Sequence, residues 1–150
     1  MPSTTGQQAR AETGRLPLGT ASLLRHSKYM RILVADDNSE IRAALRLLLG
    51  ELGELDISEA GDVDEALRAV SGTTVEIVLL DWELAGSSSA HSEANSAGFV
   101  REAKRRAPGC RVIAMSVRPE AQTESLRAGC DAFVSRTDSP DRLLALLGLE

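Results

Sequence analysis

The sequence is poor in aromatic residues and cysteine, and it lacks any long apolar run. Phe, Trp and Tyr make up 3% of the 150 residues, and Cys110 and Cys130 have neither C-x-x-C spacing nor a nearby histidine. A disulfide framework and a zinc site are therefore not indicated, and reduced, buried thiols are expected. No apolar stretch approaches the roughly 20 residues of a membrane-spanning helix, and no secretory signal opens the chain, so a soluble cytoplasmic protein is predicted.

The chain also lacks a stripe of basic residues. Its net charge is −5, and the 29 residues before Met30 hold four of the 17 basic residues but only one of the 22 acidic ones. The remainder thus carries 13 basic and 21 acidic residues, a net charge of −8. Because nucleic-acid binding depends largely on Lys and Arg that neutralise phosphates, direct contact with nucleic acid is not expected.

Residues 1–29 show no hydrophobic periodicity. They mix Ser, Thr, Gly, Gln, Pro and Arg, a composition that cannot bury enough surface to fold, so a disordered tail is predicted. Met30 opens directly onto an apolar run and is an alternative start, while the Arg-rich, acid-poor tail is also compatible with an organelle transit peptide. Residues 30–150 are long enough for one domain with its own core.

From Met30 onward, short aliphatic runs alternate with longer amphipathic segments, the pattern of an α/β fold. Strands are predicted at Arg31–Ala35, Leu55–Glu59, Val75–Leu80, Arg111–Met115 and Ala132–Ser135. Helices are predicted between and after them, from a cap at Ser39 to Gly53, from Asp62 to Gly72, from Gly98 to Ala107, from Pro119 to Ala128 and from Pro140 to Leu147. Five such units with right-handed crossovers predict a doubly wound, five-stranded parallel sheet of the flavodoxin-like kind, with strand order 2-1-3-4-5.

Three aspartates end two of the apolar runs. Asp36 and Asp37 follow the first predicted strand, and Asp81 follows the third. In open parallel sheets, ligands bind outside the carboxyl ends of the strands, and the predicted order places the first and third strands side by side. The three carboxylates are therefore expected to share one oxygen-rich cation site. The alternative is helix capping by Asp36 and Asp37, with Asp81 as an unrelated loop acid.

From Met30 to its end, the chain resembles the receiver domain of two-component response regulators. The resemblance rests on the order and strand-end placement of four blocks, which are specific only together. The blocks are Ile-Leu-Val-Ala-Asp36-Asp37-Asn, Val-Leu-Leu-Asp81-Trp-Glu-Leu, Val-Ile-Ala-Met-Ser116 and Ala-Gly-Cys-Asp-Ala-Phe133-Val-Ser-Arg136. The resemblance implies a signalling module rather than an enzyme.

The resemblance also implies roles for the acidic residues. Asp81 would accept a phosphoryl group from a phosphohistidine on a histidine kinase or phosphotransfer protein. Asp36, Asp37 and Asp81 would bind Mg²⁺, and the backbone carbonyl of Glu83 would supply a further ligand. Mg²⁺ commonly takes hard oxygen ligands from one or two carboxylates, and it would relieve the repulsion between these acids and the phosphoryl oxygens.

Three further residues have roles implied by the resemblance. Ser116 would donate its hydroxyl to the phosphoryl group, and Phe133 would act as the aromatic switch. Arg136, followed by Thr137, replaces the family's usual lysine and proline. Arg keeps the positive charge but is not interchangeable with an ammonium group, and a solvated surface position is the alternative. Val117 stands where the family commonly has a small residue, and its β-branched side chain would narrow access to the acceptor.

Two more departures concern the loop after the acceptor and the end of the chain. Residues 86–98 make this connection about nine residues longer than the family norm. The longer connection is either a docking or lid element or a tolerated insertion. Because the sequence ends soon after its last helix, a stand-alone receiver is expected, with output through an unidentified downstream protein. The leucines of that helix are predicted to be core residues first and a homodimer surface second.

Two other functions are compatible with the sequence. A pseudo-receiver, which binds partners without being phosphorylated, is favoured by Arg136, Val117 and the long loop. An aspartate-nucleophile phosphohydrolase would use the same acids, with Glu83 as an acid/base two residues after Asp81. If Glu83 and Arg118 pair across the mouth of the site, they would exclude attacking water and prolong the phosphorylated state.

Overall fold

The computed structural model describes residues 29–86 and 95–148. Contacts divide the chain into a unit of Met1–Met30 and a unit of Arg31–Glu150, and the described helices belong to the second unit. Nearly all of the tail predicted at residues 1–29 and most of the loop predicted at residues 86–98 lie outside the described residues. None of the described helices combines the length and the apolar character needed to cross a membrane.

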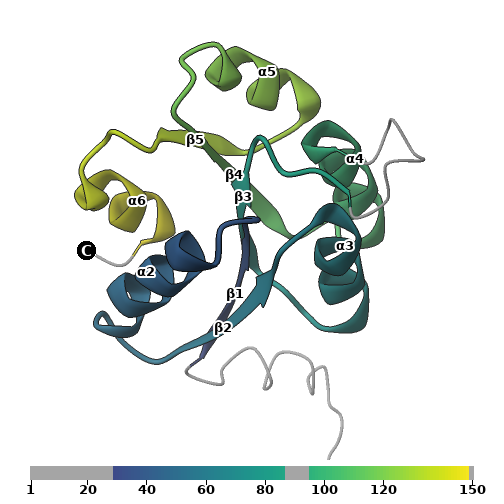
Figure 1. Ribbon diagram of the computed structural model, residues 1–150. Helices are drawn as coiled ribbons and strands as arrows, with labels where there is room; N and C mark the ends of the chain where they lie inside the picture. Colours follow the sequence, from purple (N-terminus) through teal and green to yellow (C-terminus); the bar gives the residue numbers. More distant parts are fainter. Residues whose placement is uncertain (1–28, 87–94, 149–150) are drawn as a thin grey trace, which may run out of the picture. The chain divides into compact units, whose positions relative to one another are not determined.

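A single sheet of five strands forms the centre of the domain (Figure 1). Its strand order is β2-β1-β3-β4-β5, and the pairs β1–β3, β3–β4 and β4–β5 are parallel. The predicted doubly wound α/β fold and its strand order are therefore confirmed. The strands are β1 (Met30–Ala35), β2 (Leu55–Ala60), β3 (Ile77–Asp81), β4 (Arg111–Ser116) and β5 (Ala132–Ser135).

Helices cover both faces of this sheet. Figure 1 shows α2 and α6 on one side and α3, α4 and α5 on the other. The helices are α2 (Ser39–Gly50), α3 (Val63–Gly72), α4 (Ser96–Arg106), α5 (Ala121–Ala128) and α6 (Pro140–Leu147). Covering on both faces explains why the middle strands read as continuous apolar runs rather than as alternating ones.

Buried side chains lie on both faces of the middle strands and form the core. Leu33 and Leu80 join a buried cluster with Phe99 and other residues of the α3–α5 side, whereas Val34, on the opposite face of β1, is also fully buried. On the α2–α6 side, the buried helix residues include Leu49, Leu143 and Leu147. The leucines of the last helix are thus partly core residues, as predicted.

Several predicted boundaries were wrong by a few residues. The cap of α2 is Asn38 rather than Ser39, because the Asn38 side chain accepts hydrogen bonds from the backbone amides of Glu40 and Ile41 at 2.8 and 3.3 Å. An asparagine in this position satisfies amides that have no partner inside the helix. In addition, α2 ends at Gly50 rather than Gly53, β3 begins at Ile77 rather than Val75, α4 begins at Ser96 rather than Gly98, and α5 begins at Ala121 rather than Pro119.

Candidate functional site

Three carboxylates meet at the carboxyl ends of β1 and β3. The parallel register pairs Ala35 with Leu80, so Asp36, which directly follows β1, lies beside Asp81, the last residue of the adjacent strand β3. One carboxylate oxygen from each of Asp36, Asp37 and Asp81 lies within 4.8 Å of the other two. Asp36 is 1% exposed and Asp81 is 6% exposed, whereas Asp37 is exposed. The convergence predicted from the strand order is present, and its oxygen atoms are of the kind that hard cations prefer.

Backbone hydrogen bonds orient the two buried carboxylates. The amide of Asn38 donates to Oδ1 of Asp36 at 2.9 Å, and the amide of Glu83 donates to Oδ1 of Asp81 at 3.0 Å. The Nη1 atom of Arg42 donates to the backbone carbonyl of Asp36 at 2.6 Å and holds the turn after β1. Both carboxylates are therefore held by the residues that directly follow their strands.

Arg136 is the cation of this site. It follows β5, and its Nη2 lies 2.5 Å from Oδ2 of Asp36 and 3.6 Å from Oδ1 of Asp81. Its side chain is 18% exposed, so the alternative of a solvated surface residue is wrong. One guanidinium thus compensates part of the charge on two buried carboxylates, as burial of charged groups requires.

The surroundings of Asp81 favour its protonated form. Burial is the largest cause of a raised pKa for this carboxyl, and the charges of Asp36 and Asp37 raise the pKa further. The hydrogen bond from the Glu83 amide and the charge of Arg136 lower it, but they do not outweigh burial. A buried acid surrounded by other acids gains stability from any added cation.

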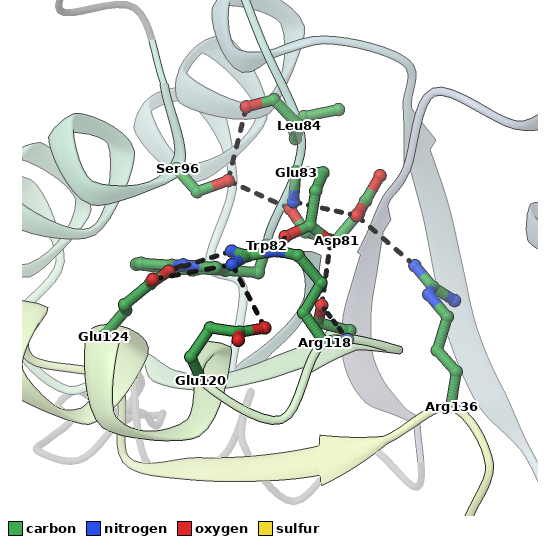
Figure 2. A network of polar contacts seen from close by, with 10 residues as sticks. Asp81, Trp82, Glu83, Leu84, Ser96, Arg118, Glu120, Glu124 and Arg136 are labelled. Atoms are coloured by element: carbon green, nitrogen blue, oxygen red, sulfur yellow. Dashed lines mark hydrogen bonds and ion pairs between the residues drawn. The ribbon is translucent and has the colours of Figure 1, made fainter.

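Glu83 and Arg118 form the ion pair that was considered from the sequence. Arg118 Nε lies 2.9 Å from Oε2 of Glu83, while Oε1 of Glu83 accepts a hydrogen bond from the Ser116 hydroxyl at 2.9 Å (Figure 2). The same Ser116 oxygen accepts a hydrogen bond from the Arg118 amide at 3.0 Å. Ser116 is completely buried, and its hydroxyl hydrogen is directed to Glu83.

The ion pair continues to helix α5. Arg118 Nη2 lies 2.9 Å from Oε1 of Glu124, which also accepts a hydrogen bond from the indole Nε1 of Trp82 at 3.0 Å. Arg118 Nη1 lies 3.5 Å from Glu120. Trp82 therefore links the turn after β3 to α5 (Figure 2).

The remaining predicted residues lie around this centre. Phe133 is 8% exposed and packs in the buried cluster on the α3–α5 side of the sheet. Val117 is 63% exposed. The hydroxyl of Thr137 lies 2.8 Å from that of Ser135, in the turn that carries Arg136.

Sequence reasoning missed three polar residues that support the site: Asn38, Arg42 and Ser96. Asn38 had a recognisable signal, since it directly precedes a helix. Arg42 and Ser96 had none, because each donates to a backbone carbonyl that only the folded chain brings within reach. The Ser96 hydroxyl lies 3.0 Å from the carbonyl oxygen of Asp81.

The sequence matches the response regulator receiver domain family over residues 32–148. Among curated relatives, the transcriptional activator protein ExaE of Pseudomonas putida is 33% identical over 114 residues, which cover 74% of this chain and 50% of ExaE. The phosphate regulon transcriptional regulatory protein PhoB of Escherichia coli is 29% identical over 119 residues, which cover 77% of this chain and 48% of PhoB. The chain thus spans about half the length of these curated relatives.

Solved structures of similar proteins have the same fold. The receiver domain of NtrX from Brucella abortus matches with a TM-score of 0.67 and 26% identity, covering 78% of this chain and 94% of that one. A two-component response regulator of the LuxR family from Aurantimonas matches with a TM-score of 0.70 and 22% identity, covering 80% of this chain and 83% of that one.

Proposed function

The chain belongs to the response regulator receiver domain family, and on this premise we propose that Asp81 accepts a phosphoryl group from a phosphohistidine donor. The donor is a histidine kinase or a phosphotransfer protein, and the phosphorylated domain signals by binding a downstream protein. Receiver domains are signalling modules rather than enzymes in general. A cytoplasmic location and the absence of direct contact with nucleic acid belong to the same proposal.

The observation that carries this proposal is the position of the Asp81 carboxylate. Among the described residues, its hydrogen bond and its ion pair both involve Oδ1, which leaves Oδ2 as the nucleophile. Oδ2 forms the new bond to phosphorus as the bond from phosphorus to the histidine nitrogen breaks, and the electron pair of that bond leaves with the imidazole. Such a transfer requires mainly positioning and charge stabilisation from the protein.

The three clustered carboxylates fit a Mg²⁺ ion. Asp36, Asp37 and Asp81 would supply carboxylate oxygens, and the backbone carbonyl of Glu83 would supply a fourth ligand. When bound, the ion neutralises negative charge on the acids and on the phosphoryl oxygens. The arrangement of three acids against one arginine supports this assignment, because the cluster keeps an excess of negative charge among the described side chains.

Arg136 and Ser116 would hold the transferred group. The guanidinium of Arg136, already 3.6 Å from the Asp81 carboxylate, can donate two parallel hydrogen bonds to phosphoryl oxygens. Ser116 would exchange its bond to Glu83 for one to the phosphoryl group. Phe133, two positions before Ser135 on the neighbouring strand β5, is the proposed aromatic switch that passes this change to the surface.

Intact mass after incubation with Mg²⁺ and a small acyl phosphate tests the proposal. We expect the gain of one phosphoryl group, lost in the variant Asp81→Asn and without Mg²⁺. Asp131→Asn, which removes a carboxylate paired with Lys104 away from the acidic cluster, is the matched control and should be labelled like the parent protein. Labelling of Asp81→Asn to the same extent would refute Asp81 as the acceptor.

A pseudo-receiver is the second candidate, and the contact between Arg136 and Asp36 favours it. This contact compensates part of the charge of two buried carboxylates with a side chain of the protein itself, which is compatible with a site that works without phosphorylation. Under this alternative, the mass experiment would show no gain under conditions that label an ordinary receiver. Partner binding by the unphosphorylated protein would then be the activity to measure.

A further inference from the structure

The hydroxyl of Ser96 is a buried polar group that the proposed transfer leaves unused. Ser96 is the first residue of α4 and is 2% exposed. Its Oγ lies 3.0 Å from the carbonyl oxygen of Asp81 and 3.3 Å from that of Leu84. Figure 2 draws both contacts as dashed lines. Helix α4 is thereby tied to the backbone of the acceptor residue, 15 positions earlier in the chain.

The two carbonyl groups bracket a tight turn at residues 81–84. The amide of Leu84 donates to the carbonyl of Asp81 at 3.0 Å, and the amide of Glu83 donates to the carboxylate of Asp81 at 3.0 Å. The turn therefore sets two things at once, the direction of the Asp81 carboxylate and the direction of the Glu83 carbonyl. Both groups are proposed ligands of the metal.

The base of the following loop is closed next to Ser96. Ala85 and Asn95 form an antiparallel bridge, and the Asn95 side chain caps α4 by accepting a hydrogen bond from the amide of Gly98 at 2.9 Å. Ser96 directly follows Asn95, one of the two residues of this bridge. The first residue of α4 therefore holds the turn at residues 81–84, although the connection between β3 and α4 separates the two in the chain.

We propose that Ser96 is a positioning residue, whose hydroxyl holds the turn at residues 81–84 in the geometry that metal binding and phosphoryl transfer require. This inference rests on the proposed function for its consequence, whereas the hydrogen bonds of Ser96 involve only groups of the chain itself. Ser96 does not touch the phosphoryl group; it acts through the backbone of Asp81 and Leu84.

The hydrogen-bond partners in the turn explain why the hydroxyl is needed. The Asp81 carbonyl has a second donor in the Leu84 amide, whereas the Leu84 carbonyl has Ser96 as its donor among the described residues. Leu84 is 1% exposed, so removal of the hydroxyl leaves its buried carbonyl without a donor among the described residues. Such a group is costly, and the turn will shift to hydrate it.

The test compares Ser96→Ala with Ser125→Ala in the full chain. Ser125 is also completely buried, but its hydroxyl donates within α5 to the carbonyl of Gln122 at 3.2 Å, so it controls for the loss of a buried hydroxyl. In Mg²⁺ titrations followed by amide chemical shifts, Ser96→Ala should raise the dissociation constant about three- to tenfold, the scale of one hydrogen bond. Ser125→Ala should leave it unchanged.

Hydrogen exchange in the metal-free protein provides the second measurement. The amides of Glu83 and Leu84 should exchange faster in Ser96→Ala and at the parent rate in Ser125→Ala. If Ser96→Ala does not fold, Ser96→Cys, whose thiol is a weak donor, should show the same changes to a smaller extent. Parent-like exchange together with a parent-like Mg²⁺ dissociation constant would overturn the inference.

The two proposals fail in different ways. If the parent protein takes up no phosphoryl group while Ser96→Ala still weakens Mg²⁺ binding, the proposed function is wrong and the positioning role stands. If the parent protein is phosphorylated and Ser96→Ala matches it in exchange, metal binding and phosphorylation rate, the positioning role is wrong and the function stands.

Discussion

Asp81→Asn should stabilise the metal-free protein at neutral pH, although it removes the proposed acceptor. Burial, followed by the charges of Asp36 and Asp37, raises the pKa of Asp81 above its model-peptide value. The folded protein therefore binds more protons than the unfolded chain between an unfolded pKa of about 3.9 and the higher folded value. The free energy of unfolding falls as pH rises through this interval, and the ionised Asp81 carboxylate still destabilises the folded protein at pH 7.

The size of the stabilisation expected for Asp81→Asn follows from the charges around the Asp81 carboxylate and from its burial. At an effective dielectric constant of about 20, two unit charges no more than 4.8 Å apart repel by at least about 3.5 kcal/mol, and opposite charges 3.6 Å apart attract by about 4.6 kcal/mol. Repulsion from Asp36 and attraction to Arg136 are thus of similar size, and Asp37 adds repulsion, so these charges do not offset the cost of burying the Asp81 charge. Asparagine keeps an acceptor for the Glu83 amide, so a gain on the order of 1 kcal/mol is expected.

Thermal unfolding in EDTA between pH 4 and pH 8 measures this gain. For a domain of this size, 1 kcal/mol corresponds to a rise in Tm of about 3–6 °C, present at pH 7 and shrinking towards pH 4. The control Asp131→Asn should have the opposite sign at pH 7, because hydrogen bonds from Lys104 and the Val112 amide outweigh burial and lower the pKa of Asp131. An Asp81→Asn protein no more stable than its parent at pH 7 would refute the reasoning.

Two further predictions concern the mouth of the site and the cysteines. Arg118→Ala removes the partner of Glu83 and should shorten the half-life of the phosphorylated state about three- to tenfold, because water gains access to the phosphoryl group. Arg127→Ala, on the exposed side of α5, should leave the half-life unchanged. Phosphate release after removal of the donor measures both half-lives, and equal values for the two variants would contradict the prediction. Burial raises the pKa of Cys110 and raises that of Cys130 to about 12, so neither thiol should react with iodoacetamide at pH 8 until the protein unfolds. Labelling in the folded state, followed by mass, would show that the thiols are accessible.

The local pattern of the sequence was sufficient for the fold and for the acidic centre. Apolar runs of strand length, separated by amphipathic segments, are a property of neighbouring residues, so the five units could be predicted, and the strand order followed from the usual topology of such units. The aspartates could be placed for the same reason, because a residue at the end of a strand lies at a known edge of a parallel sheet. Helix starts were less predictable, as Asn38 shows, because several residues near a helix start can act as its cap.

Only the tertiary structure decided which side chains contact one another at the site. Arg136 meets Asp36 across 100 positions of the chain, and Arg118 meets Glu83 across 35. Such contacts depend on strand register and on the rotamers of long side chains, neither of which hydrophobic periodicity encodes. Ser96 is the clearest case, because only the fold brings the start of α4 within hydrogen-bond distance of the backbone of Asp81, 15 positions earlier in the chain. The sequence by itself determined where the acids lie, and packing determined what holds them.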